Sequence, residues 1–459
     1  MKKLNLFAAL IAGITVVSSC KDKGGDPTPE VVLDSSESLS NSFFDKVAYK
    51  GAFGLTDWTA GWANFNPKTT VYPAPTATLS GSITTNTTLD ASKVYLLSGF
   101  VYVESGVTLT IPAGTIIRGD KVSKASLIVT KGAKLIAEGT AAKPIIFTSN
   151  AEVGQRAPGD WGGIVILGKG IHNLSGGVIE GGFTLPKGEH GGTDNTDNSG
   201  VLKYVRVEFP GIAYTNNNEI NGITFGSVGS GTTVDYVQVA FSGDDSFEFF
   251  GGAVNAKHLI STSNVDDAFD FDNGFSGKLQ FCVAQRDQSL ADQAGQSNGI
   301  EADNSEKDFA VGPRTRPVIS NMTIIGPGNV GLIDPKHEYL NLWRRGAKMV
   351  LANSIFIGGR YGIDIRDKET SDALLDNSAT GSLIKNNIWQ SYAAGKDVVT
   401  GGTANALFTV DIAKTYLTGK GNTIIDETAA AALLATPFSL TAPSFILKAS
   451  SAASTGASF

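Results

Sequence analysis

VDYVQVAFSGDDSFEFFGGAVN (234–255) is followed directly by AKHLISTSNVDDAFDFDNGFSG (256–277), and the two stretches align without a gap at a period of 22 residues. In each, an alternating apolar segment leads into a turn with two acidic residues, and a second segment with phenylalanines at alternate positions follows. The aligned pairs are Asp244/Asp266, Asp245/Asp267, Phe247/Phe269, Glu248/Asp270 and Phe249/Phe271. Such self-similarity predicts a solenoid, in which each unit stacks on the one before it.

The same pattern recurs on both sides of these two units. Upstream, LKYVRVEFPG (202–211) matches the start of the first unit, and downstream SNGIEAD (297–303) and GIDIR (362–366) match the second segment. Further upstream, GVTLTIPAGTIIRGD (106–120) and ASLIVTKGAKLIAEGTAAKPIIFTSN (125–150) alternate short strands with glycine turns. The repeats therefore extend over most of the chain.

Units of this length, made of short strands and polar turns, indicate a right-handed parallel β-helix with coils spaced by ~4.8 Å. Alternate residues should face the interior and form two ladders. The first ladder is expected to contain Val205/Val207/Phe209, Val237/Val239/Phe241, Leu259/Ser261/Ser263 and Phe281/Val283/Gln285. The second is expected to contain Ile223/Phe225, Phe247/Phe249, Phe269/Phe271, Ile300/Ala302 and Ile363/Ile365. We therefore predict an all-β solenoid with N- and C-terminal capping segments, since the leucine spacing of leucine-rich repeats and the longer blades of a propeller are missing.

Composition supports this fold class. The chain has 459 residues, of which 41% are hydrophobic, only 18% are charged and 54 are glycine. This profile excludes a disordered chain, and two cysteines exclude a disulfide scaffold. The formal net charge is −7 and no basic stripe is present, which argues against a nucleic-acid partner.

The N-terminus resembles a bacterial lipoprotein signal peptide. Lys2 and Lys3 precede an apolar run that ends in small residues and Cys20. The resemblance implies removal of residues 1–19 and acylation of Cys20; the alternative is an ordinary signal peptide that happens to contain a cysteine. The polar, Gly/Pro-containing segment 20–40 is expected to be the linker of a protein anchored by its lipid in the outer membrane, on the outer face of the cell.

Two flanks differ from the repeats. Residues 41–77 are rich in aromatic residues, and residues 427–459 begin with the helix-like run TAAAALLAT. Because the ends of a β-helix expose apolar cross-sections, we expect both flanks to cap the body at 78–426. A sugar-binding role for Trp58 and Trp62 is the alternative to packing.

The coil motifs SGDDSFEFFGG, AFDFDNG and PRTRPVISNMTIIG resemble those of the pectate-lyase-like right-handed β-helix superfamily. More narrowly, they are similar to a group of uncharacterised bacterial surface lipoproteins. The resemblance covers most of Thr78–Asp426 and implies the fold. It does not imply one activity, because such folds serve lyases, hydrolases, adhesins and phage spikes.

An acidic ladder should lie outside the second ladder of inward residues. Its predicted members are Thr224, Glu248, Asp270, Glu301 and Asp364, with Asp244, Asp245, Asp266 and Asp267 on the preceding turns. Carboxylates on adjacent coils would lie ~5 Å apart, and each like-charge pair would cost about 3 kcal/mol at an effective dielectric near 20. A bound cation, basic neighbours or raised pKa values must offset this repulsion.

A hard cation such as Ca²⁺ suits a cluster of carboxylate oxygens. The predicted metal ligands are Asp244, Asp245, Glu248, Asp266, Asp267, Asp270, Asp272 and Glu301. The spacing also resembles that of calcium-bearing coils in β-helix polysaccharide lyases, which implies an ion that neutralises a uronate and a basic residue that takes the adjacent proton. The alternative is a metal-free ladder neutralised by Arg314, Arg316, Arg344, Arg345, Arg360 or Arg366.

No spacing identifies a catalytic base, although Lys257, Arg286 and Lys307 are candidates, and His258 and Cys282 are expected to be a surface histidine and a packed thiol. The sequence therefore predicts a lipid-anchored surface protein that binds a glycan or has a structural role. The alternative is a calcium-dependent polysaccharide lyase or a related glycan-cleaving enzyme.

Overall fold

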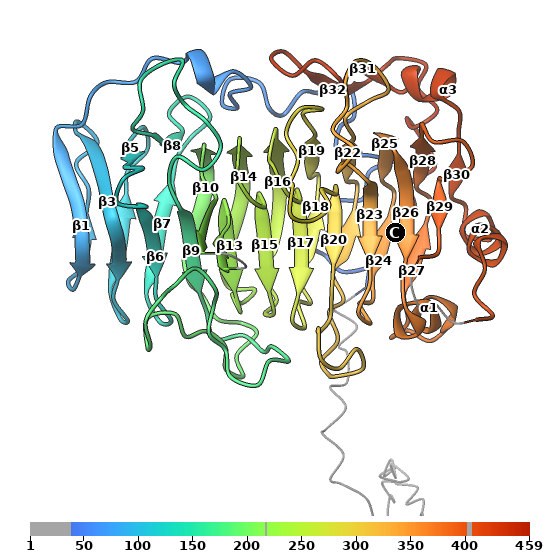
Figure 1. Cartoon of the computed structure of the whole chain (residues 1–459), viewed down its shortest axis with the longest axis horizontal. Coiled ribbons are helices and arrows are strands. Elements are labelled where there is room, and N and C mark those ends of the chain that lie inside the picture. The colour runs from blue at the N-terminus through green and yellow to red at the C-terminus, as the bar shows by residue number, and fades with distance from the viewer. Residues whose placement is uncertain (1–37, 216–217, 402–405) are drawn as a thin grey trace, which may run out of the picture. The chain divides into compact units, whose positions relative to one another are not determined.

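The computed structural model describes residues 38–215, 218–401 and 406–459. The predicted signal peptide and Cys20 lie outside these residues, as does most of the predicted linker. The described residues belong to one compact unit, Leu33–Phe459, which is built around a single 28-stranded sheet. All strand pairs of this sheet are parallel, so the chain forms the predicted right-handed parallel β-helix. Figure 1 shows the coils stacked from β1 to β30.

The strands fall into three stacks, or faces, that run along the β-helix. Face 1 consists of β1 (Ala77–Ile83), β3 (Val94–Val103), β5 (Ile116–Gly119), β8 (Ile145–Ser149), β10 (Gly200–Glu208), β14 (Thr233–Ala240), β16 (Asn255–Thr262), β19 (Val283–Gln285), β22 (Thr323–Ile325), β25 (Ile355–Gly359), β28 (Ile388–Ser391) and β30 (Thr423–Ile424). Face 2 continues from the ends of β1 and β3 through β6 (Ser126–Val129), β9 (Gly163–Leu167), β13 (Ile223–Gly226), β15 (Phe247–Phe250), β17 (Phe269–Asp272), β20 (Ile300–Ala302), β23 (Tyr339–Trp343), β26 (Tyr361–Ile365) and β29 (Val398–Val399). Face 3 consists of β2 (Thr87–Thr88), β4 (Thr108–Ile111), β7 (Lys134–Glu138), the starts of β10, β14 and β16, β18 (Lys278–Gln280), β21 (Val318–Ser320), β24 (Val350–Ala352) and β27 (Leu383–Lys385).

The remaining elements are short. They are the 3-10 helix η2 (Pro67–Thr69), the hairpins β11 (Ile212–Thr215) with β12 (Asn218–Ile220) and β31 (Leu434–Thr436) with β32 (Ser444–Leu447), and the helices α1 (Lys368–Leu375), α2 (Val410–Gly419) and α3 (Glu427–Ala431). The helix-like run is helical only to Ala431 and then enters β31. None of the helices in the described ranges has the length and apolar character needed to cross a membrane.

The second ladder of inward residues is confirmed on face 2. Phe247 pairs with Ile223 on one side and with Phe269 on the other, and Phe269 pairs with Ile300. The prediction missed one coil, however, because β23 lies between β20 and β26. That coil places Asn341 in the inward row, where the pattern would have an apolar side chain.

The first ladder is correct through Leu259 and then slips by one residue. Val205, Val237 and Leu259 pair in register, but Val283 pairs with Ile260 instead of Ser261. The slip arises because the next coil has one extra residue. Ala284 therefore enters the main core, while Val283 faces the outer side of face 1.

Phe209 and Phe241 also differ from the prediction. Both have positive φ, at 62° and 57°, so the chain turns a corner at each of them. They pack on each other and on Ala240 in a separate small cluster, and not in the main core.

A second row of corners explains the position of His258. Tyr236, His258 and Phe281 occupy left-handed backbone positions with φ between 52° and 57° and stack on one another. The Nδ1 atom of His258 lies 2.7 Å from Asp235 Oδ1. His258 is thus a half-buried, paired residue and not the surface histidine that we expected. Cys282 is buried, and burial raises its pKa to about 12, which agrees with a packing role.

The flanks lie along the side of the β-helix, whereas the sequence suggested that they cover its ends. The N-terminal segment contacts later coils first, with Ala52 N donating to Thr323 Oγ1 at 2.8 Å, and earlier coils afterwards, with Asn64 N donating to Gln238 Oε1 at 2.8 Å. Apolar side chains on the outside of face 1 require this cover. They pack with both flanks in one cluster that contains Phe53, Trp62, Ile260, Val283, Ile325, Ile355, Ile357, Ile388, Leu434, Phe445 and Leu447.

Trp62 is only 1% exposed, which supports packing over sugar binding for this residue. At the last coil, α2 contributes Ala413 and Leu417 to the main core and so covers the C-terminal end.

Candidate cation-binding site

The outward side chains of face 2 form the acidic ladder. In β13, β15, β17 and β20 the register places Thr224, Glu248, Asp270 and Glu301 on consecutive coils. They point outward because the neighbouring phenylalanines and isoleucines of the same strands point into the core. Asp364 is separated from Glu301 by Leu342, so the continuous ladder ends at Glu301.

The turns before β15 and β17 add two pairs of aspartates. Asp245 Oδ1 accepts a hydrogen bond from the backbone N of Asp267 at 2.7 Å, and Asp267 Oδ1 accepts one from the backbone N of Asn298. Each buried aspartate therefore fixes the turn of the next coil. This backbone role was not apparent from the sequence, which placed both residues simply on turns.

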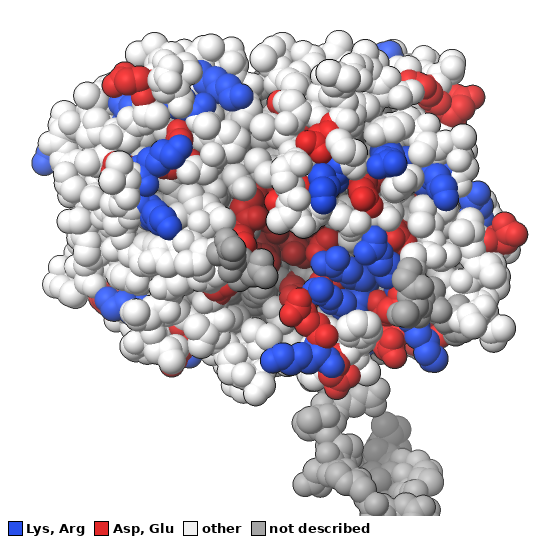
Figure 2. Space-filling view, in the orientation of Figure 1, with Lys and Arg blue, Asp and Glu red and all other residues white. Residues whose placement is uncertain are grey.

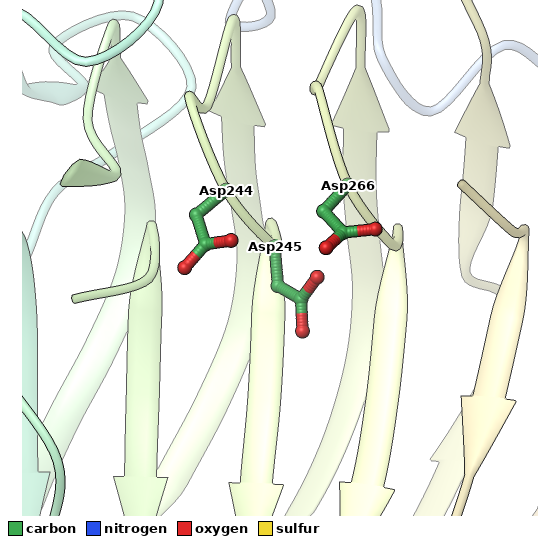
Figure 3. A group of neighbouring side chains, drawn as sticks. All are labelled: Asp244, Asp245 and Asp266. Carbon is green, nitrogen blue, oxygen red and sulfur yellow. The ribbon is translucent and has the colours of Figure 1, made fainter. Parts of the chain in front are cut away.

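Seven of the eight predicted metal ligands come together in three overlapping groups. In each group, the candidate ligand oxygens lie within 4.8 Å of one another. The groups are Asp244/Asp245/Asp266, Asp245/Glu248/Asp270 and Asp267/Asp270/Glu301. Figure 3 shows the first of them, with the three carboxyl groups on neighbouring turns. The sharing of Asp245 and Asp270 joins the groups into one row.

Asp272 is the predicted ligand that does not join the row. It is in register with Phe250, at the far end of β17, and its carboxylate accepts hydrogen bonds from the backbone and side chain of Asn273. Among the described residues, Asp272 belongs to none of the three groups.

Burial and mutual repulsion raise the pKa values of the carboxyl groups in this cluster. Burial raises the pKa of Asp245, Glu248 and Asp270 well above the ordinary range, and neighbouring carboxylates raise it further. Asp267 is shifted to a pKa of about 8, chiefly by burial and by Asp266. The side-chain Oδ1 of Asp270 is buried and has no hydrogen-bond partner among the described residues. The positive charge of buried Arg286 lowers the pKa of Asp266 and Asp267 only in part, so the pKa values of the cluster stay raised.

Two further carboxylates, which were not among the predicted site residues, approach the row from insertions between coils. Glu180 lies within the long irregular loop between β9 and β10, and its pKa is raised to about 7 by burial and by Glu219 of the β12 hairpin strand. Asn221 Nδ2 donates a hydrogen bond to Glu248 Oε2. No repeat spacing could have revealed Glu180 or Glu219, because both lie in insertions between coils.

Within the described ranges, arginine side chains form ion pairs with carboxylates at one end of the row. Arg344 pairs with Glu301 and, at 2.8 Å, with Asp303, and Arg345 lies 2.6 Å from Asp303. Arg366 pairs with Asp364 at 2.8 Å. Even so, burial and Asp267 hold the pKa of Glu301 above its ordinary range.

The other predicted arginine partners do not reach the ladder. Arg314 donates to the carbonyl of Gly346, Arg316 to that of Gly381, and Arg360 to that of Pro335. They hold loops in place. The alternative of an arginine-neutralised ladder therefore describes only the coils from Glu301 onward.

The three candidate bases also lie away from the acidic ladder or are held by other contacts. Lys257 pairs with Asp45 of the N-terminal flank at 2.6 Å, and Lys307 is exposed on a loop. Arg286 is buried, and its guanidinium donates to the backbone carbonyls of Val265 and Asp266. None of the three is placed to take a proton from a ligand over the ladder.

The sequence profile of the pectate-lyase-like β-helix domain matches residues 81–431, about three quarters of the chain. The chain belongs to the pectate-lyase-like β-helix family. No curated protein and no solved structure matches the chain significantly. Membership of this family therefore supports the β-helix body, but it does not determine the activity, which depends on the residues of the site.

In this pectate-lyase-like β-helix, the acidic row lines a cavity of about 380 Å³. Its walls include Asp245, Asp266, Asp267, Asp270, Gln296, Glu301, Arg344 and Arg366. Figure 2 shows the result on this face, where a hollow lined by acidic side chains adjoins a group of basic ones. A ligand in the cavity would meet both signs of charge at once.

Proposed function

We propose that the protein is a surface lipoprotein, held in the outer membrane by acylated Cys20, whose β-helix binds calcium in the acidic cavity and an anionic glycan over it. The observation that carries this proposal is the set of three overlapping carboxylate groups within 4.8 Å. Each group offers oxygen ligands to a hard cation, and a cation would offset the repulsion that raises their pKa values.

Calcium fits better than smaller or softer ions. It accepts six to eight oxygen ligands in flexible geometry, and the row supplies carboxylates without any histidine or cysteine. Zinc favours nitrogen and sulfur ligands, and magnesium requires a strict octahedron. The glycan part of the proposal rests on Arg344 and Arg366, which line the same cavity and could pair with carboxylates of a bound sugar.

A calcium-dependent polysaccharide lyase is the second candidate function. It is favoured by the concave shape of the cavity, which places arginines beside the candidate ion ligands. Against it, Glu301 and Asp303 raise the pKa of Arg344, so this guanidinium stays protonated and cannot act as a base. We therefore favour binding over cleavage.

Calcium binding can be tested by thermal unfolding of the full chain in excess calcium and in chelator. Binding to the folded state alone stabilises by about 2.7 kcal/mol at a calcium concentration a hundred times Kd. In the double variant Asp245→Asn/Asp267→Asn, each amide oxygen can still accept the backbone hydrogen bond, so the coils should fold while the calcium effect disappears.

Asp194→Asn is the matched control, because Asp194 is exposed and caps a turn outside the cavity through Thr196. It should retain the full calcium effect. Identical melting curves of the wild type in calcium and in chelator would refute the metal site. Lyase activity would appear separately, as ultraviolet absorbance of an unsaturated uronate product formed from an acidic polysaccharide.

The anchor is tested independently by Cys20→Ala, which should move the protein from the membrane fraction to the soluble fraction. Retention of this variant in the membrane fraction would contradict the lipoprotein proposal.

A further inference from the structure

A second cavity, of about 400 Å³, lies on face 3 and is separate from the acidic row. It is lined by side chains from the last coils and from α2, which Figure 1 shows at the C-terminal end, and by Ser38, Leu39 and Ser40 of the N-terminal flank. We call it the lysine pocket and define it by Arg316, Leu383, Lys385, Tyr416, Lys420 and Phe459. In a protein with an excess of acidic residues, this concave surface is basic.

Two lysines of the pocket lack a counter-charge. Among residues 38–215, 218–401 and 406–459, no carboxylate lies within 4.0 Å of the ammonium group of Lys385 or Lys420. Lys385 is half-buried, and burial lowers its pKa. Lys420 is exposed at the mouth, with its Nζ 5.8 Å from the ring centre of Tyr416.

The fold holds these lysines in adjacent layers. Lys385 ends β27, and the backbone N of the next residue, Asn386, donates to the carbonyl of Lys420 at 3.1 Å. A third cation, Arg316, is fixed at the base by hydrogen bonds to the carbonyls of Ala379 and Gly381. The backbone segments that carry these cations are therefore held next to one another by the fold.

The acidic residue of the pocket does not neutralise them. Asp376 is exposed, and its carboxylate accepts hydrogen bonds from the backbone N and the hydroxyl of Ser378, each at 2.9 Å. These bonds lower its pKa and direct it toward its own turn.

We propose that the lysine pocket binds the phosphate group of an organic phosphate monoester. Such a group carries about −1.5 to −2 charges at neutral pH, which matches two unpaired lysines, whereas a carboxylate would leave one of them unpaired. Lysine binds phosphate as a point charge and requires no planar fork. The apolar side chains of Leu383 and Phe459 in the same wall would contact the organic part. This proposal does not depend on the acidic cavity or on its ion.

Calorimetric titration of the full chain with phenyl phosphate tests the proposal. Phenyl phosphate should bind saturably and more tightly than inorganic phosphate, because only the former can use the apolar wall. The double variant Lys385→Gln/Lys420→Gln should bind phenyl phosphate about a hundredfold more weakly, roughly tenfold for each charge-assisted hydrogen bond removed. Lys396→Gln, an equal change of charge at an exposed site outside the pocket, should bind as the wild type does.

Melting temperatures verify that the glutamine variants are folded, so that weaker binding is not the result of unfolding. Absence of phenyl phosphate binding in the wild type would overturn the proposal, as would equal binding in the wild type and the double variant. Titration with soluble dihexanoyl phosphatidic acid distinguishes a lipid phosphate from a free small-molecule phosphate as the ligand of the pocket. Binding much tighter than that of phenyl phosphate identifies a lipid phosphate, whereas equal or weaker binding identifies a free small-molecule phosphate.

Discussion

Face 2 carries carboxylates along much of its length, but only some of those in the described coils are paired with arginine side chains. In the coils of β15 and β17, which we call the acidic half, Glu248 and Asp270 stack next to the turn aspartates, and no basic side chain of the described part of the chain forms an ion pair with either of them. In the coils of β20, β23 and β26, the arginine half, Asp303 and Asp364 pair with arginines. The backbone is the same in both. Arginines therefore neutralise one half, whereas the carboxyl groups of the other half keep raised pKa values, and the calcium ion that we propose would bind there.

The largest expected effect concerns the core that both halves share. Phe269→Ala removes a fully buried ring that stacks on Phe247, so we expect a loss of about 3–5 kcal/mol in the free energy of unfolding. The loss should be the same with and without calcium, because the ring lies on the inner side of the strand. Urea denaturation measures it. Phe250→Ala, on the opposite side of β15, is the control and should cost less; the reverse order would contradict the register.

The next effect separates the halves directly. Arg344→Gln removes the arginine partner of Glu301 and one of the two arginines of Asp303, and we expect a loss of about 2–3 kcal/mol because these carboxylates are mostly buried. Arg345→Gln should cost less, since Asp303 retains Arg344 and Glu306 is exposed. Urea denaturation of both variants in chelator tests the comparison. Equal stability of Arg344→Gln and the wild type would show that the arginine half is not neutralised by its arginines.

The acidic half should also make stability depend on pH. Its carboxyl groups have folded pKa values above the unfolded value near 4, so between these values the native state holds more protons than the unfolded state. Stability must then fall as pH rises through the folded pKa values, which include about 8 for Asp267 and, in the insertion that approaches this half, about 7 for Glu180.

We expect a loss of about 1–2 kcal/mol between pH 6.5 and 8.5 in chelator. This window avoids the buried His190 and His337, whose pKa values are lowered to about 3 and 4. In saturating calcium the carboxylates stay ionised over the same range and the slope should vanish. Unfolding curves at several pH values give both slopes, and equal slopes with and without calcium would remove the distinction between the halves.

The repeat spacing predicted the fold because every coil obeys the same alternation of inward and outward residues. It predicted the ladder from Thr224 to Glu301 for the same reason. It failed where a coil departs from the period. One extra residue shifted Val283, and the coil of β23 was missed because Tyr339–Trp343 has no Phe-acid-Phe pattern.

The repeat pattern also could not predict which residues of the insertions between coils approach the site. Glu180 and Glu219 reach the acidic row through tertiary contacts, and the course of the N-terminal flank along face 1 depends on apolar side chains from several coils. Neither could follow from a local pattern. The repeat pattern did not predict the lysine pocket because Lys385 and Lys420 come from the last coils, where helices interrupt the regular spacing.

The smallest expected effect lies beneath the arginine half. Asn341 is fully buried in the inward row between Ile300 and Ile363, and in the part of the chain that the structure describes neither its side-chain oxygen nor its nitrogen has a hydrogen-bond partner. Leucine has a similar size, so Asn341→Leu should fill the same space without the desolvation cost of an unpaired amide. We expect a gain of about 1 kcal/mol, since such a group costs about 1–3 kcal/mol and the new methyl groups must still fit.

Asn341→Asp is the informative control, because a buried carboxyl in this position must either ionise or stay unpaired and should destabilise the coil. Urea denaturation of the three proteins gives the order expected: leucine above asparagine above aspartate. If Asn341→Leu were instead less stable than the wild type, the amide would have to be solvated within the coil. The interior beneath the arginine half would then be polar, and the two halves of face 2 would differ in their core as well as in their charges.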